Sequence, residues 1–246
     1  FKQIGLKVIP IVADNGAMGG KKSEEFMMIS EQGEDKILYD ENSGIGLNTE
    51  ILEREDYKEY LKQEYGIEDI SNFKEIRTME LGHIFQLGTR YSEMMNGKYI
   101  NQDGKETLYY MGCYGIGVSR TLAALYEQCV VKNAKGDSCG FVLPNKIAPY
   151  MVQIIPKMEN PEKVELAEDL YDSLKQKAMG AIIDDRKNIT MGAKIKDAKI
   201  LGTPYMLVIG DKIENDKLEL EDNKTGEKFV GTRDEVFRKI LELRMS

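Results

Sequence analysis

Residues 111–127 read MGCYGIGVSRTLAALYE, and this stretch places a glycine turn directly before a helix. Gly115 and Gly117 let the backbone turn sharply and approach a ligand closely. From Val118 the apolar residues recur at helical spacing, so the sequence predicts a helix that begins there. Arg120 falls in the first turn of that helix, where a cation opposes the helix dipole unless an anion lies nearby.

The position of Arg120 has two interpretations. A phosphate would be a suitable partner, because a guanidinium binds it in bidentate geometry. Alternatively, the arginine is a surface residue in an ordinary strand-to-helix turn. A dinucleotide-binding loop is not indicated, since Arg120 stands where the third glycine of G-x-G-x-x-G belongs. A generic nucleotide-binding oxidoreductase is therefore excluded, also because the flanking pattern is not that of a parallel sheet.

The segment before the turn predicts antiparallel strands. It reads TMELGHIFQLGTRYSEMMNGKYINQDGKETLYYMGCYG from residue 78, and its Asn-Gly and Asp-Gly dipeptides are turn signals. Ideal alternation puts His83 and Phe85 on one face of a strand and Glu80 on the other, unless a bulge at Gly82 changes this. His83 is the only histidine, and it is either a satisfied structural residue or a donor or switch. Cys113 is expected to be a small buried hydrophobe.

Composition excludes several classes of function. The 246 residues allow one large domain or two of ordinary size, and no apolar run approaches the roughly 18 residues of a membrane span. Three cysteines without CxxC spacing argue against a disulfide framework and predict a reducing compartment, the cytoplasm. A net charge of −8 leaves only a local basic patch for nucleic acid. Since the chain begins at Phe1 inside what reads as a helix end, we expect residues upstream.

The pattern changes at residues 141–150, FVLPNKIAPY, which contain two prolines and predict a domain boundary. Before it lie antiparallel strands and a helix; after it, strands alternate with helices, as in an α/β domain of about 100 residues. In the first part, helical spacing between Glu53 and Gly66 predicts a helix on a solvated surface excursion. In the second part, Gly180 is the predicted cap of a helix, and T-x-x-E from Thr232 predicts a capping box.

The second part also carries the most basic run of an acidic chain, DDRKNITMGAKIKDAK at residues 184–199. One interpretation is a solvated helix face. The other is a patch that contacts RNA phosphates while bases are read nearby. The cations of the run are Arg186, Lys187, Lys194, Lys196 and Lys199.

These segments together resemble one family. MELGHIFQLGTRYSEMMN followed by MGCYGIGVSRTLAALYEQ closely resembles bacterial-type and mitochondrial-type prolyl-tRNA synthetases, the second segment being motif 3 of class II aminoacyl-tRNA synthetases. VIPIVADNGAMGGKKSEEF resembles the stretch after motif 2 of the family. PNKIAPYMVQIIP and IDDRKNITMGAKIKDAKILGTPYMLVIGD resemble its anticodon-binding domain. The resemblance covers nearly the whole chain.

The resemblance implies an α+β fold: part of an antiparallel-sheet class II catalytic core at residues 1–143, then an α/β anticodon-binding domain with a mixed five-stranded sheet at residues 147–246. The editing insertion of the family is reduced to about residues 42–74, so no cis-editing of alanyl-tRNA is expected. Motifs 1 and 2 lie upstream in the family. The fragment alone is therefore expected not to activate proline, and homodimer formation is expected of the full-length enzyme.

The resemblance also implies roles for individual residues. Arg120 is the implied catalytic residue and would hold the γ-phosphate of ATP. Residues implied near ATP or the adenylate are Glu80, His83, Gly115, Gly117 and Arg120. Phe85 and Cys113 match positions at the proline pocket. Residues implied to face the anticodon region of tRNA are Arg186, Lys187, Lys194 and Lys196. No protein ligand for a metal is implied.

The implied activity is that of a proline–tRNA ligase. L-Proline and ATP give prolyl-adenylate and pyrophosphate, and the prolyl group then passes to the 3′ end of tRNA(Pro). Catalysis would depend on positioning and on charge stabilisation by arginines and Mg²⁺. The alternative is a non-catalytic tRNA-binding or regulatory paralogue. Glu24 leaves room for this alternative, because it replaces the histidine of the family sequence S-H-E-F.

Overall fold

The computed structural model describes residues 1–211 and 217–243 in two compact units, Phe1–Ala124 and Leu125–Ser246. The units divide within helix α3 (Val118–Gln128), before the boundary that the prolines predict. The hairpin of β9 (Val130–Lys132) and β10 (Ser138–Phe141) belongs to the second unit, where Leu143 N–H donates to Gly202 O over 3.0 Å. The domain ranges 1–143 and 147–246 that the family resemblance implies remain predictions.

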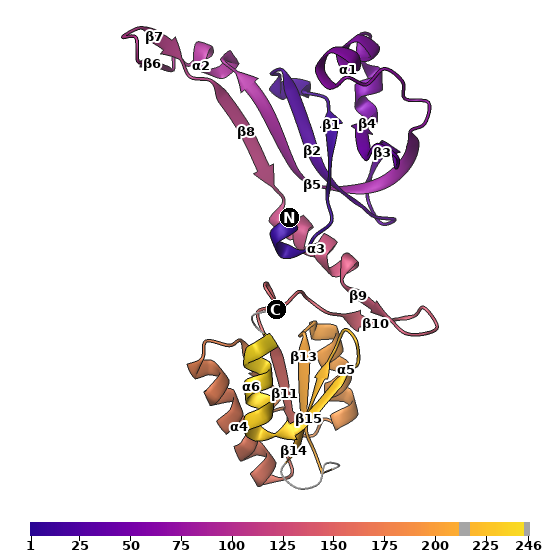
Figure 1. The fold of residues 1–246 in the computed structure, drawn as a ribbon, viewed down its shortest axis with the longest axis vertical. Helices are drawn as coiled ribbons and strands as arrows, with labels where there is room; N and C mark the ends of the chain where they lie inside the picture. The colour runs from indigo at the N-terminus through magenta and orange to yellow at the C-terminus, as the bar shows by residue number, and fades with distance from the viewer. Residues whose placement is uncertain (212–216, 244–246) are drawn as a thin grey trace. The chain divides into compact units, whose positions relative to one another are not determined.

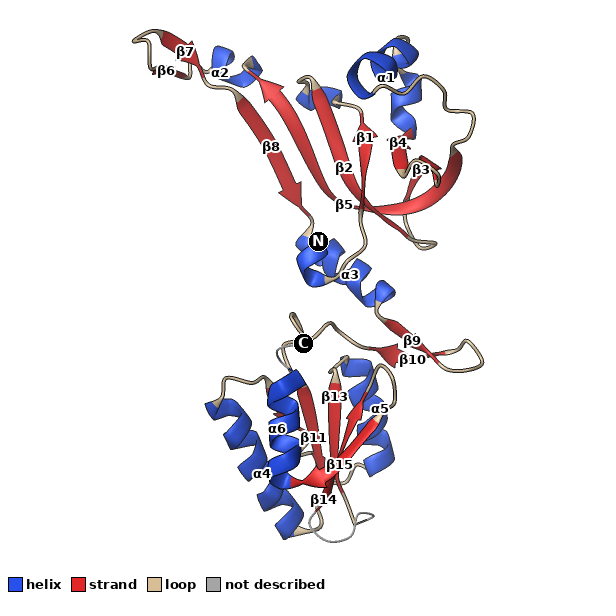
Figure 2. Ribbon diagram, in the orientation of Figure 1, coloured by secondary structure: helices blue, strands red, loops and turns tan. Residues whose placement is uncertain are grey.

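The first unit contains a sheet with the strand order β2-β1-β4-β3-β5-β8, in which β2 also pairs with β5 (Figures 1 and 2). All pairs are antiparallel except β1 with β4. Because β5 pairs with β3 near its start and with β2 further along, the first five strands close on themselves. The strands are β1 (Ile9–Ala13), β2 (Lys22–Ile29), β3 (Asp35–Asp40), β4 (Ile45–Asn48), β5 (Lys74–Gly88) and β8 (Met111–Ile116).

The closed strands surround a small apolar core of Ile11, Met27 and Ile37, each no more than 2% exposed. The outer face is covered by η3 (Thr49–Glu53) and α1 (Tyr57–Tyr65). Tyr60 and Leu61 of α1 are buried against Val12 and Leu47 of the sheet, so the prediction of a solvated excursion is wrong. The helical spacing correctly predicted α1. The Glu and Lys content of the helix, however, gave no sign of its buried apolar stripe.

The remaining elements of the first unit are short. The segment TRYSEMM was predicted as strand, but β5 ends at Gly88, whose φ is 61°, and a helix follows. The predicted turn residues Asn96 and Gly104 both have positive φ. The short elements of the first unit are η1 (Lys2–Ile4), η2 (Gly16–Met18), α2 (Arg90–Met94), β6 (Lys98–Ile100) and β7 (Glu106–Leu108).

The second unit is a three-layer α/β domain around a mixed five-stranded sheet of order β12-β11-β13-β14-β15, as predicted (Figure 2). Strand β11 is buried along its whole length. Its Ile154 packs with α4 and α6, whereas Ile155 packs with α5 on the other face. The elements are β11 (Val152–Pro156), α4 (Pro161–Gln176), β12 (Ala181–Ile183), α5 (Met191–Leu201), β13 (Tyr205–Ile209), β14 (Lys217–Asp222), β15 (Lys228–Thr232) and α6 (Arg233–Leu243).

Two predicted helix ends in this unit have different outcomes. The capping box is confirmed, because Thr232 N–H donates to Glu235 Oε2 over 2.8 Å and Glu235 N–H donates to Thr232 Oγ1 over 3.4 Å. The cap at Gly180 is wrong, since α4 ends at Gln176 and the left-handed residue is Ala178, with φ 54°. Gly180 is required for another reason: a Cβ there would lie 2.3 Å from Pro149 O.

Substituting Gly180→Ala forces the backbone at Pro149 to move, and we expect a loss of about 1–3 kcal/mol in the free energy of unfolding. The matched control is Gly192→Ala in α5, where a Cβ meets nothing within 4 Å. Its effect is expected to lie between none and a gain of about 1 kcal/mol, because alanine favours the helix. Urea unfolding followed by circular dichroism measures both, and equal stabilities would contradict the close contact.

Candidate active site

A one-residue irregularity in β5 assembles the site. Phe26 of β2 lies opposite Gly82, but the next residue, Met27, lies opposite Glu80, so the register shifts at Leu81. Ideal alternation would direct Glu80 away from His83. The shift instead brings Glu80 Oε1 to 3.6 Å from His83 Nδ1. The ideal alternation is therefore wrong here, and the alternative of a bulge beside Gly82 is confirmed.

The same irregularity directs two backbone carbonyls toward the start of α3. Leu81 O accepts a hydrogen bond from Gly117 N–H over 2.9 Å. Glu80 O accepts one from the Arg120 guanidinium over 2.7 Å, and the Glu80 carboxylate lies 3.2 Å from the same nitrogen. Arg120 thus has its anionic partner, and its side chain is still 51% exposed. A ligand can reach this cation without unfolding any element.

His83 lies between two carboxylates and a hydroxyl. Its Nε2 is 2.5 Å from Ser23 Oγ, and its Nδ1 is 3.6 Å from an oxygen of Glu25 and from one of Glu80. Burial lowers the pKa of His83, and the charges of Glu80 and Glu50 only partly oppose this. The imidazole is therefore neutral near pH 7. We assign its proton to Nδ1, facing the carboxylates, so that the Ser23 hydroxyl donates to Nε2.

Glu25 is the most buried carboxylate of the site, at 8% exposure. Burial raises its pKa to about 7, with smaller contributions from the charges of Glu80, Glu50 and Asp35. A hydrogen bond of 2.9 Å that Asn48 Nδ2 donates to the Glu25 carboxylate partly lowers this pKa again. A carboxyl group with this pKa changes its charge near neutral pH, which is unusual outside functional sites.

Sequence reasoning did not find Ser23, Glu25 or Asn48 as parts of the site. Alternation in S-E-E-F places Ser23 and Glu25 on one face of β2, opposite Phe85 and His83 of β5. That alternation was a usable signal, but the pairing of β2 with β5 was not predictable from it. Asn48 comes from β4, across the closed strands, and no local pattern indicates its contact.

The residues predicted to lie near ATP converge on one open depression of about 270 Å³. A Cβ at Gly115 would meet no atom within 4 Å, so this glycine leaves room for a ligand. The depression opens beside the first turn of α3, where the helix dipole favours an anion. Its lining consists of Glu80, Leu81, Gly82, His83, Gly115, Ile116, Gly117 and Arg120.

The two residues predicted at the proline pocket lie beside His83, one pair further along β5 and β8 on the same face of the sheet. Phe85 and Cys113 are partners across β5 and β8, and Ser23 is the partner of Phe85 on the other side. The ring of Phe85 stacks on His83, with centroids 4.0 Å apart and planes at 21°. Cys113 is half-buried beside them. Apolar and polar parts of the candidate site are therefore contiguous.

Glu24 does not belong to this site. It follows Ser23 in β2 and points to the opposite face, where it lines a separate cavity with Tyr65 and Ile67. The charge of Glu24 raises the pKa of Tyr65, although burial of the tyrosine has the larger effect. Glu24, which stands where the family sequence has a histidine, therefore faces away from His83.

The basic run of the second unit is only partly exposed. Lys194 is 1% exposed, and its ammonium donates to Asp184 O over 2.8 Å. The prediction that Lys194 contacts tRNA does not hold, because a buried ammonium reaches no phosphate. Arg186 binds the carboxylates of Asp184 and Asp197, each at 2.7 Å, and these bonds keep its pKa above the usual value. Within the basic run, the exposed cations that form no ion pair with any described residue are Lys187 and Lys196.

Glu25, Glu80 and His83 offer three ligand atoms within 4.8 Å of one another. Mg²⁺ prefers oxygen ligands and commonly binds one or two carboxylates together with substrate phosphates. The imidazole does not suit it, and Glu25 is partly protonated at neutral pH. Of this group, Glu80 is the carboxylate that fits Mg²⁺.

A curled, mainly antiparallel sheet that ends in a glycine turn and an arginine-bearing helix defines the catalytic core of class II aminoacyl-tRNA synthetases. The model of the tRNA synthetase class II core domain (G, H, P, S and T) matches residues 1–129, and the anticodon binding domain matches residues 151–243. The chain belongs to this class II synthetase family. Within the described residues, no helix combines the length and apolar character needed to cross a membrane.

The relatives confirm the resemblance to prolyl-tRNA synthetases. The proline–tRNA ligase of Sulfurimonas denitrificans is 33% identical over 257 residues, covering 99% of this chain and 57% of the relative. The proline–tRNA ligase of Aliarcobacter butzleri is 45% identical over 166 residues, covering 67% of this chain and 28% of the relative. The match to the Sulfurimonas denitrificans protein runs along nearly all of this chain but spans little more than half of that relative. A solved prolyl-tRNA synthetase from Cryptosporidium parvum, complexed with L-proline and AMP, shares the fold with TM-score 0.67 at 18% identity, covering 99% of this chain and 41% of that one.

The pKa of Glu25 predicts how stability depends on pH. Its folded pKa of about 7 exceeds the ordinary value of 4.5, so the folded state retains a proton that the unfolded state releases. Stability is therefore lost as pH rises from 4.5 to 7, by up to about 3 kcal/mol. Glu25→Gln keeps the acceptor for Asn48 and is expected to remove this loss.

Urea unfolding at pH 5 and pH 8 measures the effect as a difference between the parent chain and Glu25→Gln. The control is Glu24→Gln, whose side chain points to the opposite face and which is expected to keep the loss. The same pH dependence in the parent chain and in Glu25→Gln would show that Glu25 ionises normally.

Proposed function

We propose that the protein to which this chain belongs is a cytoplasmic proline–tRNA ligase. The observation that carries the proposal is the convergence of Glu80, His83 and Arg120 on the depression beside α3. Family membership and the proline–tRNA ligases among the relatives support it. Since the chain spans 57% of a relative that matches it throughout, the activity is proposed for the longer protein and not for these residues alone.

In the proposed reaction, the carboxylate of L-proline attacks the α-phosphorus of ATP and pyrophosphate leaves. Arg120 would neutralise the γ-phosphate, exchanging its contact with the Glu80 carboxylate for one with phosphate oxygens. The backbone carbonyl of Glu80 would still hold the guanidinium, as it does over 2.7 Å here. Arg120 is thus positioned before ATP arrives, which reduces the cost of ordering it.

The stacked rings of His83 and Phe85 would form one wall of the proline site. A flat wall suits the pyrrolidine ring, and Cys113 beside it is compact enough to leave space. The neutral His83 is held by Ser23 and cannot rotate without losing that bond. Mg²⁺ bound with ATP would be held by Glu80 and would neutralise phosphate charge.

In the second half of the proposed reaction, a hydroxyl at the 3′ end of tRNA(Pro) attacks the prolyl carbonyl and AMP leaves. The anticodon region of the tRNA would contact the exposed Lys187 and Lys196 of the second unit. Lys194 and Arg186 would act indirectly, because their bonds to Asp184 fix the loop that carries Lys187. A homodimer of the full-length protein is part of the same proposal.

The two half-reactions provide the test, in the full-length protein. Arg120→Ala is expected to lower proline-dependent ATP–pyrophosphate exchange by about 10²-fold or more, because it removes charge stabilisation of the transition state. Lys187→Glu is expected to leave exchange unchanged and to lower kcat/KM for tRNA(Pro) aminoacylation by about tenfold through phosphate repulsion. Exchange is measured with labelled pyrophosphate, and aminoacylation with labelled proline.

The controls are Arg238→Ala and Lys175→Glu, which change exposed cations outside both sites. Neither is expected to alter exchange or aminoacylation. A parent protein that binds tRNA but shows no proline-dependent exchange would refute the ligase and leave the non-catalytic tRNA-binding paralogue.

A further inference from the structure

Asn48 joins two parts of the first unit through the two ends of one side chain. It is the last residue of β4 and the N-cap of η3, where its Oδ1 accepts a hydrogen bond from Glu50 N–H over 3.0 Å. Its Nδ2 donates to Glu25 Oε2 over 2.9 Å. Because a backbone N–H can only donate, the cap fixes which end of the amide is the oxygen and leaves the NH₂ group facing Glu25.

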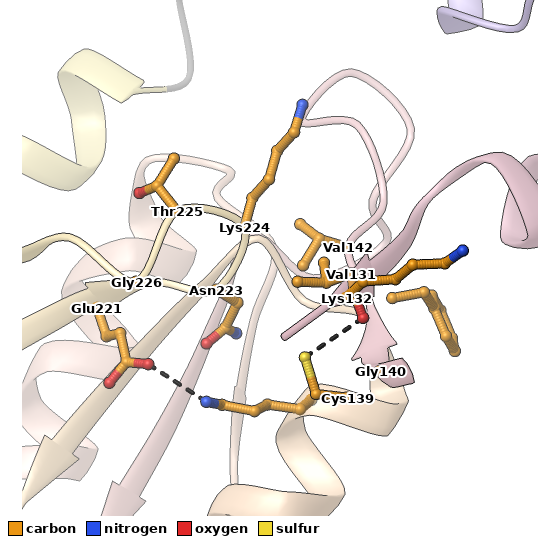
Figure 3. Close-up of a pocket in the computed structure, with 12 residues that line it drawn as sticks. Val131, Lys132, Cys139, Gly140, Val142, Glu221, Asn223, Lys224, Thr225 and Gly226 are labelled. Atoms are coloured by element: carbon orange, nitrogen blue, oxygen red, sulfur yellow. Dashed lines mark hydrogen bonds and ion pairs between the residues drawn. The ribbon is translucent and has the colours of Figure 1, made fainter. Parts of the chain in front are cut away.

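Another buried asparagine of the chain uses its amide differently. Asn223 follows β14 at the edge of a cavity of about 220 Å³ (Figure 3). Its Nδ2 donates to Thr203 O over 2.8 Å, but its Oδ1 has no hydrogen-bond partner within the described residues. That contact ties two connecting segments of the second unit together. In Asn48, by contrast, both ends of the amide are paired, and one of them binds the carboxylate beside His83.

The bond from Asn48 determines how Glu25 faces the histidine. Glu25 is buried, so its carboxylate has few partners other than those that the fold supplies. Asn48 holds Oε2 of this carboxylate, and Oε1 is left 3.6 Å from His83 Nδ1. Without the amide, a buried carboxylate oxygen would lose its hydrogen bond, and the side chain would rotate toward another donor or toward water. The distance between Glu25 and His83 therefore depends on Asn48.

His83 connects this contact to the wall of the proposed proline site. Its Nε2 lies 2.5 Å from Ser23 Oγ, and its Nδ1 faces Glu25, so residues of β2 face both nitrogens of the ring. The same ring stacks on Phe85, with centroids 4.0 Å apart. A ring that is held at both nitrogens keeps its stacking partner in place. The contacts thus run without a break from the cap of η3 to the wall.

We propose that Asn48 is a positioning residue for the proline site, acting through Glu25 and His83. Because the stacked wall of His83 and Phe85 is assigned to proline, this role rests on the proposed function. Asn48 itself does not line the depression of the candidate active site. Its side chain also caps η3, which covers the outer face of the sheet with α1. One residue therefore connects this helical cover to the candidate active site.

Asn48→Asp separates the two roles of the side chain. Aspartate caps a helix as well as asparagine does, so the bond from Glu50 N–H is kept, whereas the donor to Glu25 is replaced by a second carboxylate. In the full-length protein, KM for proline in ATP–pyrophosphate exchange is expected to rise about tenfold, because the wall is no longer fixed. KM for ATP is expected to change by less than about twofold. Asn48→Ser keeps a cap oxygen but is too short to reach Glu25, and it is expected to raise KM for proline as well.

The double variant Glu25→Gln/Asn48→Asp exchanges donor and acceptor, since the new amide can donate to the new carboxylate. It is expected to return KM for proline to within about threefold of the parent value. The matched control is Asn160→Asp at the N-cap of α4. Asn160 accepts from Glu162 N–H over 3.1 Å in the same way, and its Nδ2 donates to no described residue. This control is expected to leave both KM values unchanged.

The ring signals of His83 in proton NMR at pH 8 give a readout that does not depend on activity. His83 is the only histidine of the 246-residue chain, and stacking on Phe85 displaces its signals through the ring current of the phenyl group. The displacement is expected to shrink in Asn48→Asp and to return in the double variant. Unchanged signals together with an unchanged KM for proline in Asn48→Asp would show that Asn48 only caps η3, and would overturn the inference. A double variant that restores neither would do the same.

The two assays also separate this inference from the proposed function. A parent protein without proline-dependent exchange would refute the proposed function, and the His83 signals would then decide alone whether Asn48 positions the histidine. A parent protein with normal exchange, in which Asn48→Asp changes neither KM nor signals, would refute only the role of Asn48.

Discussion

The candidate active site depends on one backbone irregularity, the register shift at Leu81 between β2 and β5. A strand that gains an extra residue loses a pairing, and the unpaired groups must find other partners. Glu80 N–H donates to the Asp35 carboxylate over 3.2 Å, and the carbonyls of Glu80 and Leu81 accept from Arg120 and Gly117. These three backbone groups are therefore hydrogen-bonded, and two of their partners, Gly117 and Arg120, line the candidate site.

This arrangement links the two ends of the site. The shift puts Glu80 beside His83 and, in the same step, directs its carbonyl toward the start of α3. A cation in the first turn of a helix is otherwise unfavourable, and Glu80 provides the compensating charge. The position of Arg120 is thus set by the strand rather than by its own helix.

Much of this organisation was predictable from sequence. The glycine turn, α3 and the capping box at Thr232 follow from local patterns. The mixed sheet of the second unit follows from the family resemblance, which also identifies the fold. Three features were not predictable, because they depend on contacts distant in sequence. They are the partner strand that fixes the bulge at Leu81, where the sequence left ideal alternation and a bulge open, the pairing of Glu25 with His83, and the burial of Lys194 under Asp184. The Glu and Lys content of α1 led to the wrong prediction of a solvated helix, because its buried stripe is narrow.

Glu80 and His83 share one face of β5, and this arrangement can be measured directly. His83 is the only histidine of the chain, so its ring signals in proton NMR report on this site without assignment. A titration in metal-free buffer compares the parent chain with Glu80→Gln. The charge of Glu80 raises the pKa of His83 against the effect of burial, so its removal is expected to lower that pKa further. An unchanged pKa of His83 would place Glu80 on the opposite face of β5 and contradict the contact between the two side chains.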